Sequence, residues 1–306
     1  MATLIVLNPG EATIQSVDAH TGTVEVLVAG AAAVPDGLIV DEAAGVMYWT
    51  NMGLPAGSSA TSSLTGIAPF NEVNGSLERA RMDGSERAFI LPPGSFVTGK
   101  QLAADLAHGW LYFADREGMR LFRVGVDGTG PQVLVQNGDY AVASEQADEL
   151  RHCVGVAIDP VAGLLYWTQK GPNDGCCGRI LRAPARVPAD PSQRNDIETL
   201  WEGLPEPIDL CLDPDTNTIY WTDRGAEPEG NTLNRAPIPA LGKKGEKPTI
   251  LASRFREPIG LDRDCISGSI YVTDLAGNIR EINVERGIDR LVATLTGTLT
   301  GIAVIA

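Results

Sequence analysis

Gly155-Val156-Ala157-Ile158-Asp159, followed after a short turn by Leu164-Leu165-Tyr166-Trp167-Thr168-Gln169, decides the fold because the chain repeats this pattern. Each copy has an apolar segment that ends in aspartate, a turn, and then an aromatic phrase. The aromatic phrases are Tyr48-Trp49-Thr50-Asn51, Tyr112-Phe113-Ala114-Asp115, Tyr166-Trp167-Thr168-Gln169, Tyr220-Trp221-Thr222-Asp223 and Tyr271-Val272-Thr273-Asp274. By subtraction of their numbers, the leading tyrosines are 64, 54, 54 and 51 residues apart. Self-similarity at such a period indicates a repeat architecture.

One repeat contains four short strand patterns. Residues 154–158 and 164–168 are rich in β-branched and aromatic residues, with a Pro/Gly turn between them. Residues 179–183 and 197–201 supply two further strands. Four short strands with tight turns are typical of a propeller blade, and no sustained apolar stripe at helical spacing appears. The sequence therefore predicts an all-β fold.

The two ends of the chain together predict a sixth blade. Residues 299–305 match the first strand of a repeat, and residues 4–8 match the aromatic phrase, with Asn8 in its fourth position. We expect one domain over residues 1–306. It is a six-bladed β-propeller of four-stranded antiparallel blades, and residues 1–30 and 298–306 share the last blade. Closing the ring between the N- and C-termini removes exposed strand edges.

The repeated phrases resemble the YWTD, or class B, repeats of the low-density-lipoprotein receptor family over essentially the whole chain. The resemblance implies a six-bladed propeller closed between its termini. The wider six-bladed superfamily includes lactonases, gluconolactonase-like and luciferin-regenerating hydrolases, and strictosidine-synthase-like condensing enzymes. Because Met1 to Thr3 lead directly into the first strand without an export signal, we expect a free-standing, cytoplasmic version of the propeller.

The composition restricts the partners of the protein. The net charge is −15, from 24 basic and 39 acidic residues, which argues against nucleic acid and anionic membranes as partners. No segment approaches the roughly 20 apolar residues of a membrane span. We therefore expect a small-molecule substrate as the partner, with the oligomeric state left open.

Cofactors are not expected from the motifs present. No nucleotide-binding glycine motif or Gly-x-Ser-x-Gly elbow occurs, and three histidines make a closed Cys/His zinc site a poor interpretation. Ca²⁺ or another divalent cation held by Asp209, Gln101 and Asp36 stays open as an alternative. Cys176-Cys177 is open between a vicinal disulfide, a soft-metal site and two loop thiols.

A site is expected at the mouth of the central channel, where the first strands begin. Four residues before the repeated aspartates the chain has mostly glycine, but Gln101 and Asp209 break this rule. Polar side chains in a narrow channel need water, a cation or substrate as a partner. An acid, a base, a lysine and a histidine gathered there suit general acid–base chemistry. The candidate catalytic residues are Asp209, His152, Lys100 and Asp36.

Candidate substrate-binding residues come from the rim and from insertions that follow the second strands. The longest insertion, residues 52–73, is apolar enough to act as a lid over the channel. Residues 170–178, 224–231 and 137–151 are the other long connections expected on this face. The candidates are Gln101, Glu206, Glu257, Leu64, Phe70 and Tyr140. An ordered-water network in the channel, and loop-holding roles for Glu206 and Glu257, are the competing interpretations.

Two sets of repeated polar residues are interpreted as structural. The aspartates that end the first strands precede turns, where a carboxylate accepts amide hydrogen bonds. They are Asp41, Asp105, Asp159, Asp213 and Asp264. The fourth residue of each aromatic phrase is polar in every blade, which favours a repeated hydrogen bond over a site. These residues are Asn8, Asn51, Asp115, Gln169, Asp223 and Asp274.

Two classes of function follow from these features. The first is a cofactor-independent enzyme acting on a small molecule of the kind found in secondary metabolism. Its reaction would be a lyase, isomerase or cyclase step, or a lactonase-like hydrolysis, in which orienting the substrate is much of the catalysis. The second is a non-enzymatic binding scaffold like the receptor propellers. The aromatic content of 6% is mostly used in the repeated phrases, and we favour the enzyme.

Overall fold

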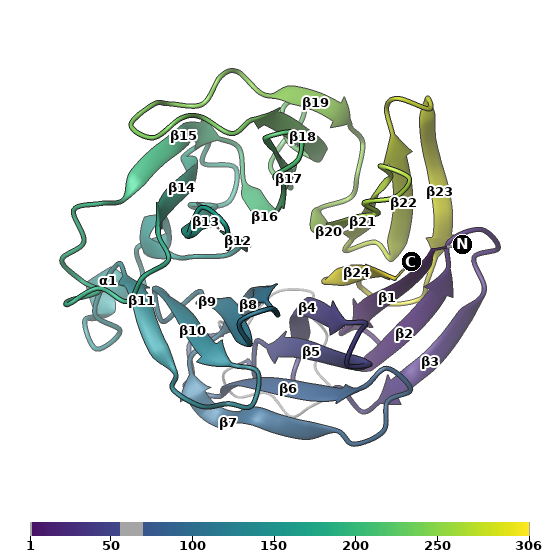
Figure 1. Cartoon of the computed structure of the whole chain (residues 1–306), viewed down its shortest axis with the longest axis horizontal. Helices are drawn as coiled ribbons and strands as arrows, with labels where there is room; N and C mark the ends of the chain where they lie inside the picture. Colours follow the sequence, from purple (N-terminus) through teal and green to yellow (C-terminus); the bar gives the residue numbers. More distant parts are fainter. Residues whose placement is uncertain (1, 56–69, 306) are drawn as a thin grey trace. The chain divides into compact units, whose positions relative to one another are not determined.

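The structure, a computed structural model, describes residues 2–55 and 70–305 (Figure 1). Their strands form six four-stranded antiparallel sheets, and each sheet is one blade. The predicted all-β fold of a six-bladed β-propeller is therefore confirmed. The predicted closing blade is present as well, because β24 (Ile302–Ile305) pairs with β1 (Thr3–Asn8) in antiparallel register.

The chain divides into two compact units, which are residues 1–101 with 256–306, and residues 102–255. The first unit contains three sheets. One has the order β24-β1-β2-β3, with β2 at Thr13–Asp18 and β3 at Val24–Ala29. The others are β4 (Pro35–Asp41), β5 (Val46–Asn51), β6 (Gly75–Arg81) and β7 (Ala88–Phe96), and β20 (Pro258–Arg263), β21 (Ile270–Asp274), β22 (Asn278–Asn283) and β23 (Ile288–Thr294), each in sequence order. The second contains β12 (Val156–Asp159)-β13 (Leu164–Gln169)-β14 (Gly178–Pro184)-β15 (Glu198–Leu204), and β16 (Pro207–Asp213)-β17 (Thr218–Asp223)-β18 (Thr232–Pro237)-β19 (Thr249–Ala252). The remaining sheet has the order β11 (Gln132–Gln136)-β10 (Arg120–Gly125)-β9 (Trp110–Asp115)-β8 (Gly99–Asp105).

The aromatic phrases pack between the blades, because their strands are buried on both faces. Trp49, Trp167 and Trp221 are among the largest fully buried side chains. In the second unit, Trp221 meets Trp201 of the preceding blade, with 5.5 Å between the ring centroids. Tyr166 belongs to the same apolar cluster. The aromatic residues that mark the repeat therefore fill the space between neighbouring blades.

Threonines of the aromatic phrases join the innermost strands of successive blades, as Thr50 and Thr168 show. Thr168 Oγ1 accepts a hydrogen bond from the Gly155 amide at 2.7 Å and donates to the Ile208 carbonyl at 2.6 Å. Thr50 makes the same two contacts, to the Gly37 amide and the Lys100 carbonyl. A short hydroxyl side chain at this position thus satisfies two buried backbone groups at once.

We expect Thr168→Val to destabilise the protein by about 2–4 kcal/mol, because it leaves two buried backbone groups without partners at nearly constant volume. Urea unfolding followed by tryptophan fluorescence measures the loss. Thr249→Val, at the exposed start of β19, is the matched control and should be near neutral. Equal stability of the two variants would show that the threonine contacts do not hold the blades together.

The repeated aspartates cap turns as predicted. Asp159 Oδ1 accepts hydrogen bonds from the Val161 and Ala162 amides, and Asp264 Oδ1 accepts from Ile266 and Ser267. Asp213 instead accepts the hydroxyl hydrogen bond of Thr216. These side chains fix the turn between the first and second strands, so they are not available for chemistry.

Among the described residues, no helix is long and apolar enough to cross a membrane.

Candidate functional site

Three predicted residues meet in the first unit. Lys100 Nζ lies 2.8 Å from Asp36 Oδ1, and Gln101 Nε2 donates to Asp36 Oδ2 at 3.2 Å. Asp36 is on β4, whereas Lys100 and Gln101 are on β8, so the contacts join neighbouring blades. All three side chains are buried, and Lys100 Nζ also contacts Met52 Sδ at 3.5 Å. The pairing of Asp36 with Lys100, expected from their positions in the repeat, is present.

A second charged cluster forms in the other unit around Glu206. Glu206 Oε2 accepts from Arg224 Nε at 3.0 Å and lies 3.5 Å from Lys170 Nζ, and Oε1 accepts from the Asp174 amide at 2.7 Å. Lys170 and Arg224 open the two insertions that follow β13 and β17, and both also contact Asn173. The two insertions therefore meet over Glu206.

Burial and the neighbouring charges together set the pKa values of this cluster. Burial lowers the pKa of Lys170, and the Arg224 charge lowers it further, while Glu206 and Glu149 oppose this effect. Burial acts to raise the pKa of Glu206, but the Asp174 amide, Arg224 and Lys170 outweigh it and hold that pKa below its usual range. Glu206 is thus held in its charged form, which suits a loop-holding ion pair.

Two of the remaining predicted residues bind backbone groups within their own unit. His152 Nε2 lies 2.9 Å from the Gln146 carbonyl, and Asp209 Oδ1 accepts from the Leu210 amide at 2.9 Å. Glu257 is exposed, and the Phe70 carbonyl accepts from the Thr98 hydroxyl. Leu64 lies outside the described residues.

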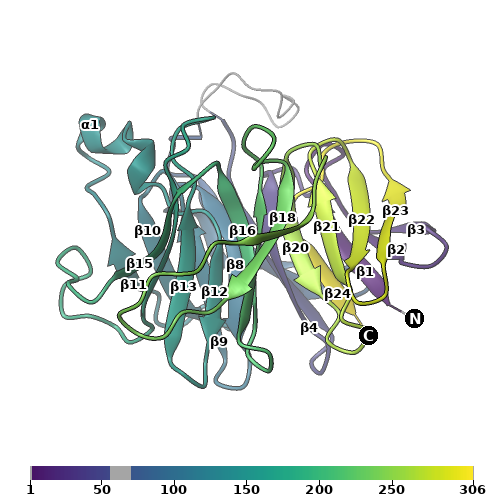
Figure 2. The same cartoon turned by 90° about the horizontal axis from the view of Figure 1, so that it is seen from above.

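The connection 137–151 contains two short helices that the strand pattern did not indicate. They are α1 (Ala143–Gln146) and the 3-10 helix Glu149–Arg151. Figure 2 shows α1 beyond the strand ends of its unit. Tyr140, in the same connection, is half-buried. His152 follows the second helix, so its imidazole ties this connection together through Gln146.

The fourth residue of the aromatic phrase makes a structural hydrogen bond in several blades, as predicted. Asp115 Oδ2 accepts from Arg120 Nη2 at 2.6 Å, and Asp274 accepts from Asn278 Nδ2 at 3.0 and 3.1 Å. Asn51 donates to Ser76 Oγ at 2.9 Å. In each case the partner is the first residue of the third strand or its immediate neighbour, which lies across from the motif residue.

Asp223 departs from this pattern. Its Oδ1 accepts from the Glu206 and Gly225 amides at 2.9 and 3.0 Å, but its buried Oδ2 has no hydrogen-bond partner among the described residues. The residue opposite is Thr232, whose hydroxyl donates to the Glu229 carbonyl at 2.9 Å. Because a hydroxyl has one proton, Thr232 has none left for Asp223.

The environment of Asp223 raises the pKa of its carboxyl group. Its side chain is 1% exposed. Burial raises the pKa of Asp223 to about 7, against the two backbone amides, and the charges of Glu206 and Glu229 raise it further. A carboxyl group with a pKa near 7 exchanges protons readily at physiological pH, which is the property that a general acid–base catalyst needs.

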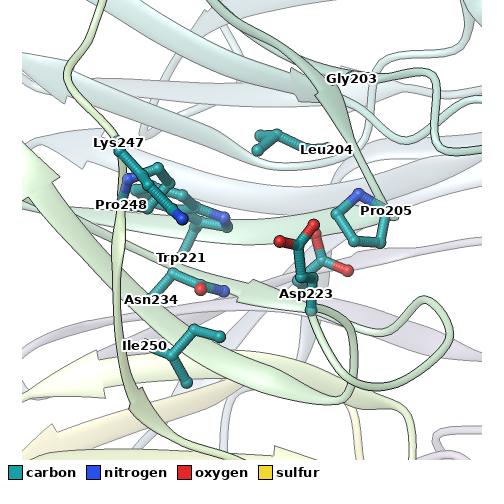
Figure 3. A pocket seen from close by; sticks show the side chains of 10 residues that line it. Gly203, Leu204, Pro205, Trp221, Asp223, Asn234, Lys247, Pro248 and Ile250 are labelled. Carbon is teal, nitrogen blue, oxygen red and sulfur yellow. The ribbon is translucent and has the colours of Figure 1, made fainter.

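A pocket of about 240 Å³ lies against Asp223 (Figure 3). Its walls come from the end of β15, from one face of β17, β18 and β19, and from the segment before β19. They are Gly203, Leu204, Pro205, Trp221, Asp223, Glu229, Asn234, Lys247, Pro248 and Ile250. Figure 3 shows Asp223 and Pro205 on one side and Lys247 and Pro248 on the other. The pocket therefore pairs apolar walls with a few charged groups, as small-molecule sites do.

The register of the blade explains why these side chains share one face. Trp221 pairs with Asn234, and Asn234 pairs with Ile250, so the three lie side by side across β17, β18 and β19. Asp223 follows Trp221 by two residues and points to the same face. The segment before β19 is fastened to the neighbouring blade, since Trp201 Nε1 donates to the Glu246 carbonyl at 2.7 Å.

Sequence reasoning missed this pocket because it treated all fourth motif positions alike. The available signal was the residue across the strand pair, which is Arg120 opposite Asp115 but Thr232 opposite Asp223. The second signal was the long connection 238–248 between β18 and β19.

Metal ligation has little support in the part of the chain that the structure describes. No group of three or more His, Cys, Asp or Glu side chains there is arranged to hold a metal ion. Both carboxylate oxygens of Asp36, a candidate cation ligand, already accept hydrogen bonds from Lys100 and Gln101. Cys176 and Cys177 are free, exposed thiols.

Comparison with known proteins defines the family. No family model matches the chain. The chain is 39% identical over 286 residues to low-density lipoprotein receptor-related protein 1 of Pyricularia oryzae, covering 91% of this chain and 87% of that protein. The chain therefore belongs to the low-density lipoprotein receptor-related family, which its YWTD repeats indicated.

A second relative combines this similarity with an enzyme-like name. The chain is 35% identical over 280 residues to the 3-hydroxyacyl-CoA dehydrogenase-like protein LAM1 of Cochliobolus heterostrophus. The match covers 88% of this chain but 56% of that protein, so the chain spans little more than half of that relative.

Solved structures with the same fold come from both functional classes. A chain of the nidogen–laminin complex superposes with a TM-score of 0.72 at 19% identity, covering 99% of this chain and 98% of that one. A gluconolactonase of Xanthomonas campestris gives 0.59 at 16% identity, covering 88% and 78%. At these identities the likeness shows the fold alone.

Proposed function

We propose that this chain is a cofactor-independent enzyme that uses Asp223 for acid–base chemistry on a small molecule. The observation that carries the proposal is a buried carboxyl group at a pocket wall, one oxygen of which has no hydrogen-bond partner in the described part of the chain. Leaving such a group unsatisfied costs stability, and a role for it outside the fold accounts for that cost. Its pKa of about 7 gives it both protonation states at physiological pH.

Lactonase-like hydrolysis is the first reaction to test, because a gluconolactonase shares the fold. In this step water attacks the ring carbonyl, and ionised Asp223 accepts the proton that the water loses. As the carbon–oxygen bond of the ring breaks, the proton passes to the leaving ring oxygen and Asp223 is ionised again. Lyase, isomerase and cyclase steps would use the same carboxyl group to move a substrate proton.

The residues at the predicted channel mouth form a second part of the proposal. Asp209, His152, Lys100 and Asp36 keep the catalytic roles suggested by their place in the repeat. A cytoplasmic location, and a small molecule rather than nucleic acid or membrane as partner, are likewise proposals.

Asp223→Asn should lower kcat on a responsive substrate by roughly 10²–10⁴-fold, the usual contribution of a general acid–base group. A panel of five- and six-membered lactones, followed by proton release, supplies the assay. Glu202→Gln is the matched control, since Glu202 adjoins the pocket residue Gly203 but is exposed and pairs with Lys244. If Asp209→Asn and His152→Ala abolish turnover while Asp223→Asn does not, the active site is at the channel mouth.

A binding scaffold is the alternative function. It is favoured by the receptor-related name of the Pyricularia oryzae protein and by the nidogen–laminin neighbour. This alternative expects a stable complex with a protein partner and no turnover of any member of the panel. A pull-down with the native protein and with Asp223→Asn separates it from the enzyme, because replacing this buried carboxyl group would leave such a complex intact.

A further inference from the structure

The pocket beside Asp223 carries two acidic groups at one end. Glu229 belongs to the loop between β17 and β18, and its backbone carbonyl is held by the Thr232 hydroxyl at 2.9 Å. The same loop is closed by a hydrogen bond from the Gly230 amide to the Ala226 carbonyl at 2.8 Å. Glu229 therefore lies on a fixed turn, and its charge acts on Asp223. An occupant at this end meets one buried and one exposed carboxyl group.

The size of the pocket limits the occupant. A cavity of about 150 Å³ accommodates benzene, and this pocket has about 240 Å³. A single ring with a short substituent therefore fits. Leu204, Pro205, Pro248 and Ile250 supply apolar walls for the ring.

We infer that the pocket binds the ammonium group of a small primary amine with one apolar ring. The ammonium group donates a hydrogen bond to the unpartnered Oδ2 of Asp223, and Glu229 supplies the second negative charge. The inference rests on the proposed function only in calling this amine a substrate. It concerns binding, which is measured without turnover.

The other charges near Asp223 leave this end of the pocket acidic. Lys170 and Arg224 pair with Glu206, and Lys170 also pairs with Glu149, so the two cations of this cluster are offset by two anions. Lys247 is the cationic residue in the pocket lining, and it is exposed on the side across from Asp223. A bound cation therefore favours the ionised form of Asp223, so binding near neutral pH releases a proton.

Isothermal titration calorimetry with benzylamine tests the inference. At pH 6.5, titrations in phosphate and in imidazole differ in buffer ionisation heat and report the protons released. We expect more than half a proton per site, because a group with a pKa of about 7 is mostly protonated at this pH. We expect Asp223→Asn to weaken binding by at least 10-fold and to abolish the proton release, with Glu229→Gln weakening it several-fold.

Two controls make the result decisive. Lys247→Ala should bind benzylamine as tightly as the native protein or more tightly, and benzyl alcohol should bind at least 10-fold more weakly than the amine. Absence of benzylamine binding, or equal binding by folded Asp223→Asn, would overturn the inference. Lactone turnover that depends on Asp223 without amine binding would reject the ligand class alone, whereas amine binding without turnover would reject the enzyme alone.

Discussion

Asp223→Asn is expected to become more stable than the native protein at alkaline pH, although the same change removes activity. Burial raises the pKa of Asp223 from 3.8 to about 7, so the folded state disfavours the ionised carboxylate. The shift is roughly three pKa units, which corresponds to about 4 kcal/mol between the two protonation states. Asparagine carries no such penalty and keeps an oxygen for the Glu206 and Gly225 amides.

The pH dependence of this effect has a definite sign. A raised folded-state pKa means that the contribution of Asp223 to stability is greatest below about pH 4 and is lost as the pH rises to about 7. The free-energy difference between the variant and the native protein should therefore grow by about 4 kcal/mol between pH 4 and pH 8. The unpartnered amide group of asparagine costs about 1–3 kcal/mol at every pH, which leaves a net gain of about 2 kcal/mol at pH 8.

Guanidinium unfolding at several pH values measures this difference, and Asp115→Asn is the matched control at the same repeat position. Asp115 is held by Arg120 at 2.6 Å, so its replacement should destabilise the protein at neutral pH. A constant difference between Asp223→Asn and the native protein across the pH range would contradict the raised pKa. If the two substitutions change the free energy of unfolding in opposite directions at pH 8, the two aspartates have different roles despite their equivalent positions.

Lys100→Ala is expected to cost about 3–5 kcal/mol, because it leaves the buried Asp36 carboxylate without its cationic partner. In this variant Gln101 Nε2 still donates a hydrogen bond to Asp36, but it carries no charge. The double variant Asp36→Ala with Lys100→Met should recover most of this loss, since it removes both buried charges.

Urea unfolding of the native protein, of Asp36→Ala and Lys100→Met singly, and of the double variant forms a thermodynamic cycle for this pair. Lys244→Ala is the control, because Lys244 and Glu202 form an exposed pair that contributes little. A loss for Lys100→Ala no larger than that for Lys244→Ala would show that Asp36 and Lys100 do not stabilise the junction between their blades. In that case the catalytic role proposed for them would gain weight.

The fold was predictable because its information is local and repeated. Each aromatic phrase indicates a buried second strand, and the aspartate before it indicates a turn. The repeats therefore identify every blade. The closing blade followed from the same pattern, since Asn8 has the place that Asn51 has in the next repeat. The short helix α1 was missed because four residues are too few to show a periodic pattern.

The candidate site was predictable only where it depends on position within the repeat. The contact of Asp36 with Lys100 followed from adjacent blades and equivalent positions. The pocket beside Asp223 depends instead on which donors remain free after Thr232 and the Glu206 amide have bonded. Such competition for hydrogen bonds is decided by tertiary contacts, which a repeat alignment does not contain.

The most direct test of this account is the titration of Asp223 itself. Carbon-13 NMR of protein labelled at the aspartate carboxyl carbons, with the resonance assigned through Asp223→Asn, gives the midpoint without any substrate. We expect a midpoint near pH 7, far above the other aspartates that accept turn amides. A midpoint below pH 5 would show an ordinary structural carboxylate and would contradict its role in catalysis.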